Sequence, residues 1–516
     1  MTDAATYRLA FGALVTIQIA TGCAGQGAPA GPQAIDATTL GERLAAELTP
    51  TIERTLAEEH VTGAAVVVVR DGRTLYKRGF GVQDIRTGMP VDADQTIFRI
   101  GSVSKPMTAW AIASLIDQGR MELDDPVSDY VPEIDGIPNI SGSDEPVRIW
   151  HLLTHTGGFD QIGIGRQVPG FDRPAAERVR ERRSLAEFLF DDNLRRTSAP
   201  GVHYRYDTYG ITLAGLVLER ATGKPFPAAM REALFEPAGM TNATVGLERL
   251  GDEWMAVGHG WIEDQQQHGI APYEVYITLP ASSVDLSGGD MESLMQAVTG
   301  GTGRDGATPF SDDMRQALMS PSFRPHSEFS GVTYGMNEIT RVGGSDGGLV
   351  AGVGHGGSVL GFSTMLMFLP EHNTGIFVVV NRNGEAGGGR VSLPNRVIST
   401  VAGLLDPDAP EQYAVPELRD GVDLGEYAGR YAYGVFCKTC TEDELGSGAW
   451  QPFSFLDVEA AGPTIVAREL VYRPTGERGV FVSENGRRKL CFLDDASGRP
   501  STVSFISSPD TFERID

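Results

Sequence analysis

Ser102 and Lys105 form the first pattern in this chain whose residue types and spacing could carry out covalent chemistry. On a helix, residues three positions apart share one face and lie about 5–6 Å from each other. A serine hydroxyl is a weak nucleophile until a base removes its proton. Lysine serves as that base when burial or a neighbouring cation lowers its pKa. An ordinary capped helix with a solvated lysine gives the same pattern, so this motif alone leaves both interpretations open.

Three further motifs contain residues that fit around an activated serine. Tyr204–Gly210 precedes a predicted helix, Gly354–Ser358 opens a predicted strand, and His151–Gly158 reads His-Leu-Leu-Thr-His-Thr-Gly-Gly. Together with S-x-x-K, these motifs resemble the serine β-lactamase and penicillin-binding-protein superfamily. The resemblance is greatest to its class C-like branch of esterases and D-amino-acid peptidases. It covers residues 40–405 and rests on four motifs in the family's order.

The resemblance implies roles for four side chains. Ser102 matches the acylated nucleophile, and Lys105 matches its activating partner. Tyr206 matches the tyrosine that exchanges protons with the nucleophile and the leaving group. The pKa of a free tyrosine is about 10, so Tyr206 requires nearby cations to act near neutrality, and Lys105 and His355 are expected to supply them.

The resemblance also implies how substrate is bound. The backbone N–H groups of Ser102 and Ser358 form the expected oxyanion hole. Gly356 and Gly357 are expected to let substrate lie close to the strand backbone. Thr208 stands where the family usually has asparagine. It keeps a hydroxyl but lacks an amide donor, so the change is expected to affect substrate binding more than the chemical step.

His355 bears on the class of substrate. β-Lactamases usually carry lysine at this position, where it helps to hold the carboxylate of the drug, whereas the family's esterases and D-peptidases often carry histidine. The residues therefore favour an ester or a D-amino-acid-containing peptide as substrate. A β-lactamase or penicillin-binding DD-peptidase remains the second hypothesis. A non-catalytic binding or sensor protein, for which Thr208 is the support, remains the third.

Other motifs in the chain compete with this interpretation. His151 and His155 have the spacing of metal ligands, but in the family's turn such side chains brace the loop, so we expect no metal and no cofactor. Gly343–Gly347 satisfies G-x-S-x-G around Ser345, and Gly352–Gly357 fits G-x-G-x-x-G. Both motifs require a following helix. The sequence there predicts strands, which argues against an α/β-hydrolase elbow and a dinucleotide site.

Composition excludes one large class of partner. The chain has 516 residues, 68 acidic against 43 basic, and a net charge of −25. Nucleic-acid binding requires clustered Lys and Arg, so a small-molecule or peptide substrate is the expected partner. The sequence leaves the oligomeric state open.

The N-terminus resembles an export signal. Arg8 precedes an apolar run, Leu9–Ala20, that is too short to span a bilayer and has the length of a signal-peptide core. Two candidate processing sites follow. Ala28–Ala30 has the small-x-small form of a signal-peptidase site, and Ala20–Cys23 resembles a lipobox with Cys23 as the lipidated residue. We expect an exported, periplasmic or cell-envelope protein, with a lipid anchor to the membrane as one form. A disordered tail is the alternative.

Apolar periodicity predicts the elements that hold the motifs. Ala64–Arg70 and Arg73–Phe80 flank Asp-Gly, a strong hairpin signal, and Phe362–Leu369 with Ile376–Val380 form a second hairpin. Strands at both ends of this region, with helices between them, predict an α+β fold in which the N- and C-terminal strands share one antiparallel sheet. Helices are expected at 40–59, 102–115, 172–193, 210–221, 226–236 and 396–405.

The last hundred residues have a different pattern from the region before them. Short apolar runs predict strands at Thr464–Leu470, Gly479–Val482, Lys489–Phe492 and Thr502–Ile506 and no long helix, which favours a small all-β domain, with a lipocalin-like barrel suggested by resemblance. Cys437, Cys440 and Cys491 predict one disulfide and one free thiol in an oxidising compartment. The expected organisation is a signal peptide at 1–23, a linker at 24–38, a catalytic domain at 39–405, a linker at 406–420 and an accessory β-domain at 421–516.

Overall fold

The computed structural model describes residues 37–515 apart from short internal segments. Those segments are 164–165, 192–193, 307, 325, 328, 344–347, 384–390, 410–418, 435–437, 444–454, 487, 496 and 506–510. Several predicted features lie outside the described residues: the signal peptide with Cys23, the first linker up to residue 36, Ser345, Cys437 and part of the second linker. In the part that is described, no helix combines the length and the apolar character needed to cross a membrane.

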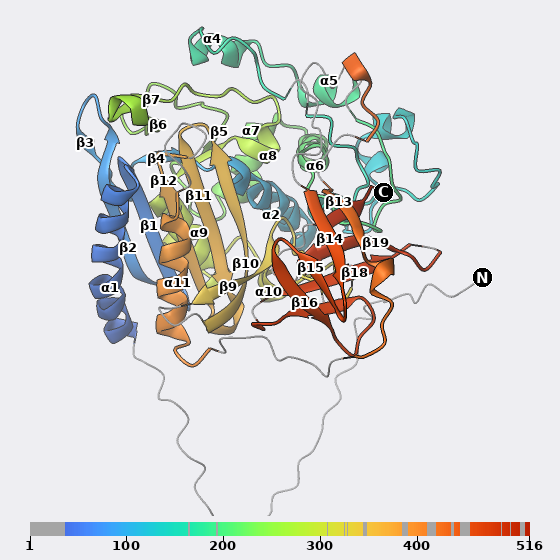
Figure 1. The fold of residues 1–516 in the computed structure, drawn as a ribbon. Coiled ribbons are helices and arrows are strands. Elements are labelled where there is room, and N and C mark those ends of the chain that lie inside the picture. Colours follow the sequence, from blue (N-terminus) through green and yellow to red (C-terminus); the bar gives the residue numbers. More distant parts are fainter. Residues whose placement is uncertain are drawn as a thin grey trace, which may run out of the picture.

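A seven-stranded antiparallel sheet forms the centre of the α+β part (Figure 1). Its order is β3-β2-β1-β12-β11-β10-β9, so strands from the two ends of this part pair directly. The predicted shared sheet and both predicted hairpins are therefore confirmed. The strands are β1 (Gly63–Arg70), β2 (Arg73–Asp84), β3 (Met89–Pro90), β9 (Asn337–Gly343), β10 (Gly348–Val359), β11 (Phe362–Leu369) and β12 (Thr374–Val380).

The sheet separates two apolar cores. Successive side chains of a strand point to opposite faces, and in β1 Val66 joins one core while Val67 joins the other. Helices α1 (Ala37–Glu58) and α11 (Leu393–Leu405) cover the Val66 face (Figure 1). Helix α9 (Gly288–Gly300) covers the opposite face against β1 and β12. Each core thus depends on the continuous apolar runs of the same strands, which place apolar side chains on both faces.

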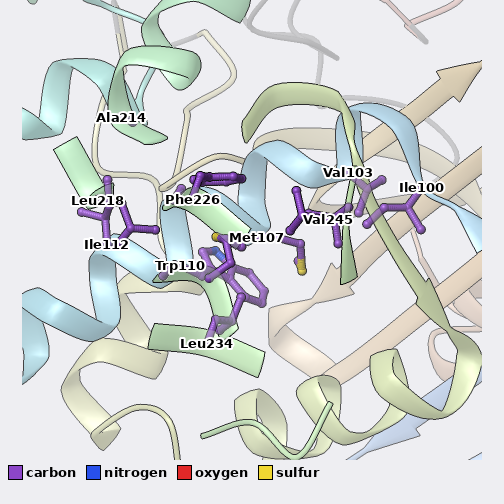
Figure 2. Close-up of a cluster of buried hydrophobic side chains, with 14 of the residues drawn as sticks. Ile100, Val103, Met107, Trp110, Ile112, Ala214, Leu218, Phe226, Leu234 and Val245 are labelled. Carbon is purple, nitrogen blue, oxygen red and sulfur yellow. The ribbon is translucent and has the colours of Figure 1, made fainter. Parts of the chain in front are cut away.

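Helix α2 (Ser104–Asp117) runs through the second core, and almost all of its side chains are buried. Figure 2 shows Met107 and Trp110 of this helix among side chains that include Phe226 and Leu234. A helix that is apolar all round is typical of a protein interior. The helix was expected to begin at Ser102, but Gly101–Val103 form a 3-10 turn and the α-helix follows it.

Several of the remaining helices pack against α2. The single helix expected over 172–193 is wrong: two short helices, α4 and α5, replace it. The Ser184 hydroxyl accepts a hydrogen bond from the Glu187 N–H, and the Glu187 carboxylate accepts one from the Ser184 N–H. This capping box starts a new helix in the middle of the predicted one. The helices are α3 (Ile149–Leu153), α4 (Ala175–Arg180), α5 (Leu185–Phe190), α6 (Thr208–Thr222), α7 (Phe226–Met230) with a π-helical turn (Arg231–Phe235), α8 (Leu279–Ser282) and α10 (Asp312–Met319).

Two small sheets complete the α+β part. The first has the order β4-β8-β5 and the second pairs β6 with β7. Strand β4 ends one residue before the Gly101–Val103 turn, so this sheet fixes where α2 begins. The strands are β4 (Ile97–Arg99), β5 (Thr244–Val245), β6 (His259–Ile262), β7 (Gln267–Ile270) and β8 (Val284–Ser287).

The C-terminal part is a closed barrel of eight strands in sequence order, which confirms the predicted all-β domain and has the up-and-down form of lipocalin barrels. The strand expected over Thr464–Leu470 is wrong, because Arg468 and Glu469 have positive φ angles and turn the chain into a hairpin. The strands are β13 (Gly429–Tyr433), β14 (Phe455–Ala461), β15 (Thr464–Ala467), β16 (Leu470–Pro474), β17 (Val480–Ser483), β18 (Lys489–Asp494), β19 (Pro500–Phe505) and β20 (Thr511–Arg514).

The cysteines of the C-terminal part take two states. Cys440 is disulfide-bonded, and its partner is not among the described residues. Cys491 on β18 is buried and outside any disulfide, and its Sγ lies 3.8 Å from His326 Nδ1. The described residues thus include one cysteine in a disulfide and one outside any disulfide, which agrees with the predicted single disulfide.

Candidate active site

Ser102 lies in the tight turn that joins β4 to α2. Gly101 makes this turn possible, because its φ of +53° is a conformation that glycine adopts without strain. Ser104 fixes the turn: its hydroxyl donates to the Gly101 carbonyl at 2.6 Å and accepts from the Val284 N–H at 2.9 Å. Ser102 itself is half-buried. The turn therefore presents the Ser102 hydroxyl at a fixed point while leaving it accessible.

Strand β10 lies against the Ser102 turn, and two glycines allow this close approach. A Cβ atom on Gly357 would lie 2.0 Å from the Ile100 carbonyl oxygen, and one on Gly101 would lie 2.9 Å from the Ser358 nitrogen. Ser358, whose hydroxyl accepts from Asn383 at 3.2 Å, is thereby held next to the Ser102 turn. Gly357 was expected to make room for substrate, but here its missing side chain makes room for Ile100.

Lys105 points its ammonium at Ser102 from the first turn of α2. Its Nζ lies 3.3 Å from the Ser102 hydroxyl oxygen and 3.1 Å from the Ala281 carbonyl oxygen. The side chain is 1% exposed. Burial lowers the pKa of Lys105 to about 7, and the Arg166 guanidinium contributes in the same direction. A large share of Lys105 is therefore an uncharged base near neutrality.

Tyr206 stands between two histidines. Its ring centroid lies 5.1 Å from that of His155 and 5.7 Å from that of His355. Lys105 Nζ lies over the face of the tyrosine ring, 4.7 Å from its centre. The structure thus brings Ser102, Lys105, Tyr206 and His355 together, as the motifs predict, although they come from three separate stretches of chain.

The residue after Tyr206 anchors it to α6. Asp207 caps this helix by accepting from the Tyr209 N–H at 2.8 Å, and it also accepts from the Gln161 amide at 2.9 Å. Burial raises the pKa of Asp207 to about 6. His155 completes the anchor, since its Nδ1 accepts from the Asp207 N–H at 3.1 Å. The backbone on the C-terminal side of Tyr206 is therefore held from two directions.

His355 does not supply the positive charge that the sequence led us to expect. Burial, reinforced by the charge of Lys105, lowers the pKa of His355 to about 3, so the ring is neutral near pH 7. Its Nδ1 donates to the Gly356 carbonyl at 2.6 Å, so Nε2 carries the lone pair, and this buried atom has no hydrogen-bond partner among the described residues. His355 therefore presents a hydrogen-bond acceptor, so the positive charge beside Tyr206 comes from the protonated fraction of Lys105.

The other predicted substrate contacts lie close by. Gly356 and His355 belong to the later half of β10, so the expectation that their motif opens a strand is wrong. Thr208 is buried in the first turn of α6, directly after the Asp207 cap. A Cβ on Gly356 would meet a methionine methyl at 3.5 Å and the Thr364 carbonyl oxygen at 3.9 Å, both ordinary contacts. This glycine is thus a place where the strand backbone is open rather than crowded by protein.

The competing motifs do not form sites in the described structure. His151 Nδ1 accepts from the Arg148 N–H at 2.8 Å and closes the first turn of α3. Gly343 and Gly348 are paired across β9 and β10, so the stretch around Ser345 joins two strands rather than a strand and a helix. Gly352–Gly357 lies within β10 itself.

Sequence reasoning missed the residues that support Tyr206. Asp207 and Gln161 are 46 positions apart, and Arg205 and Glu513 are 308 positions apart. Asp207 carried one available signal, since an aspartate directly before a predicted helix is a typical N-cap. The long-range partners have no local pattern, so no sequence signal identifies them.

The sequence matches one family model and is similar to several known proteins. The family model described as Beta-lactamase matches residues 48–398. Esterase EstB of Burkholderia gladioli is 36% identical over 204 residues, which cover 38% of this chain and 50% of the esterase. Penicillin-binding protein 4* of Bacillus subtilis is 25% identical over 76% of this chain and 85% of its own length.

Solved structures share the fold over most of the chain. The structure of SurE matches with a TM-score of 0.60 at 20% identity, covering 92% of this chain and 100% of SurE. The octameric penicillin-binding protein homologue from Pyrococcus abyssi matches with a TM-score of 0.55 at 20% identity, over 91% and 99% of the two chains. Both comparisons concern the fold.

Proposed function

Because the chain belongs to the β-lactamase family, we propose that it is a serine hydrolase that forms an acyl-enzyme on Ser102. One observation carries the proposal: a buried lysine with a pKa of about 7 lies 3.3 Å from the serine hydroxyl. Desolvation of this kind turns a lysine into a base that works near neutrality. A lysine that only stabilised a helix would not need to be buried beside a serine hydroxyl.

The reaction follows from these contacts. The Ser102 oxygen attacks the substrate carbonyl carbon while its proton passes to Lys105 Nζ. The backbone N–H groups of Ser102 and Ser358 stabilise the negative charge that develops on the carbonyl oxygen. The bond to the leaving group then breaks, and the leaving group takes a proton from the Lys105–Tyr206 pair. Water then gives a proton to the same pair and attacks the acyl carbon. The bond from this carbon to the Ser102 oxygen breaks, and that oxygen takes the proton back from the pair, which releases the acid and restores the hydroxyl.

We propose an ester or a D-amino-acid-containing peptide as substrate. A neutral His355 cannot attract the carboxylate of a β-lactam as a lysine ammonium does. The match to an esterase at 36% identity supports the same choice. A β-lactamase or penicillin-binding DD-peptidase is the second candidate, because penicillin-binding protein 4* matches 76% of the chain.

The test is the intact mass of the protein after incubation with a fluorophosphonate and, separately, with penicillin. We expect a single fluorophosphonate adduct on the wild type and none on Ser102→Ala. Turnover of p-nitrophenyl esters, D-Ala peptides and nitrocefin then ranks the substrates. An adduct that survives in Ser102→Ala would overturn the assignment of Ser102, and no adduct at all would favour the binding or sensor alternative, for which Thr208 is the support.

We also propose that the protein is exported and held at the cell envelope through Cys23. The apolar run Leu9–Ala20 and the lipobox-like Ala20–Cys23 support this. Labelling with a fatty-acid analogue is expected in the wild type and not in Cys23→Ala. Label retained in Cys23→Ala would exclude lipidation at this residue.

A further inference from the structure

The barrel reaches the residue directly before Tyr206. Arg205 is 5% exposed, and its guanidinium donates to a carboxylate oxygen of Glu513 on β20 at 2.8 Å. The other carboxylate oxygen of Glu513 accepts from the Lys438 ammonium. Although burial raises the pKa of Glu513, the charges of Arg205 and Lys438 lower it on balance. A charged carboxylate of the barrel is thus the counter-ion of an almost fully buried arginine.

A second contact leads from the barrel part to the residue directly after Tyr206. The backbone N–H groups of Lys438 and Thr439 donate to the two oxygens of the Asp160 carboxylate at 2.8 and 2.9 Å, and the Thr439 hydroxyl adds a third bond at 2.6 Å. Asp160 is 1% exposed. Its neighbour Gln161 donates to the Asp207 carboxylate at 2.9 Å. Asp160 and Gln161 therefore connect this segment to the cap of α6.

These contacts enclose Tyr206 from both sides. Arg205, before it, is held by β20, and Asp207, after it, is held through Gln161. The Thr511 hydroxyl of β20 also donates to the Tyr204 carbonyl at 3.3 Å. Figure 1 shows the barrel beside α6, the helix that follows Tyr206. The segment that carries Tyr206 is therefore part of the contact between the barrel and the α+β part.

We propose that the barrel is part of the catalytic unit and that Glu513 is a positioning residue for Tyr206. This inference rests on the proposed function. Removing one partner of a buried ion pair leaves an uncompensated charge, which drives the segment that bears it to rearrange. Because the Tyr206 ring must stay over Lys105 and between His155 and His355, a small rearrangement of Arg205 displaces the tyrosine from the reacting atoms.

The test compares Glu513→Ala and Glu513→Asp with a matched barrel variant, Glu426→Gln. Glu426 also pairs with an arginine, Arg478, which is half exposed. In Glu513→Ala we expect labelling of Ser102 by a fluorophosphonate to slow by ~10- to 100-fold at saturating probe, the scale of a misplaced catalytic group. The probe concentration for half-maximal rate is expected to stay within about twofold, since ground-state binding is not altered. Glu513→Asp recovers part of the rate, and Glu426→Gln matches the wild type.

Amide hydrogen exchange supplies a readout that does not depend on catalysis. Peptides covering 203–210 are expected to exchange faster in Glu513→Ala and unchanged in Glu426→Gln, while the rest of the α+β part keeps its protection. If the wild type is not labelled at Ser102, the proposed function fails, and exchange alone decides whether Glu513 holds the segment. If the wild type is labelled and Glu513→Ala reacts at the same rate, or if exchange at 203–210 does not change, the inference is wrong.

Discussion

Lys105 Nζ lies 3.3 Å from the hydroxyl oxygen of Ser102, and the Ala281 carbonyl holds it there through a second hydrogen bond of 3.1 Å. A neutral amine has two N–H groups and one lone pair. When one N–H is directed to Ala281, the lone pair is available for the serine proton. Burial favours this neutral form, because a charged ammonium is costly in a site with little access to water.

We expect the rate of Ser102 acylation to rise with pH through about 7, because the uncharged form of Lys105 acts as base above its pKa. The measurement is the rate of fluorophosphonate labelling over a range of pH. Lys105→Arg carries a group that stays protonated, so its rate is expected to fall by ~10²- to 10⁴-fold, the usual contribution of a positioned base. A rate that is equal on both sides of pH 7 would contradict the role of Lys105.

Gly357→Ala is expected to destabilise the protein by ~1–3 kcal/mol, the usual cost of overpacking. The added Cβ meets the Ile100 carbonyl oxygen at 2.0 Å, so either β10 or the Ser102 turn must move. Gly356→Ala is the matched control for stability, since its Cβ has only an ordinary contact. Thermal unfolding of both variants decides the matter, and equal midpoints would show that Gly357 is not required for the close approach.

His155→Leu is expected to cost ~1–3 kcal/mol, because it leaves the buried Asp207 N–H without an acceptor. The same change should slow Ser102 labelling, since Asp207 anchors the backbone next to Tyr206. His155→Asn places an oxygen close to the position of Nδ1 and is expected to retain most stability and activity. Denaturant unfolding and labelling of the two variants provide the check. Equal losses in both would argue against the hydrogen bond.

Stability is expected to fall as pH drops from about 6.5 toward 3. Burial lowers the pKa of His151 and of His355 to about 3, from an ordinary value of 6.5. Between these values each of the two histidines binds a proton in the unfolded chain but not in the folded one, so both make the free energy of unfolding rise with pH across this window. Asp207, with its raised pKa of about 6, contributes in the opposite direction at one site. Urea unfolding at a series of pH values measures the slope. His151→Asn, which keeps an acceptor for the Arg148 N–H, should make the slope shallower, and an unchanged slope would count against His151 as a source.

Features that depend on short stretches of sequence could be predicted. The S-x-x-K pair lies on one short stretch, so helix spacing alone predicts that Ser102 and Lys105 meet. The apolar runs of β1, β11 and β12 predict strands at both ends of this region, and their order around the helices predicts the shared sheet. Apolar periodicity does not detect breaks that depend on one or two residues. The capping box at Ser184 divides one predicted helix into two, and the turn at Arg468 divides a predicted strand.

By itself, the sequence determined the fold class, the family and the three side chains that meet around the candidate nucleophile, because these depend on short motifs and on apolar periodicity. Only the tertiary structure decided their electrostatic state: the neutral His355 and the pKa of Lys105 both follow from burial, to which segments distant in sequence contribute. It alone also joined Glu513 to Arg205 across 308 positions. Burial and ion pairs between distant segments exist only once the chain has packed, so no local pattern records them.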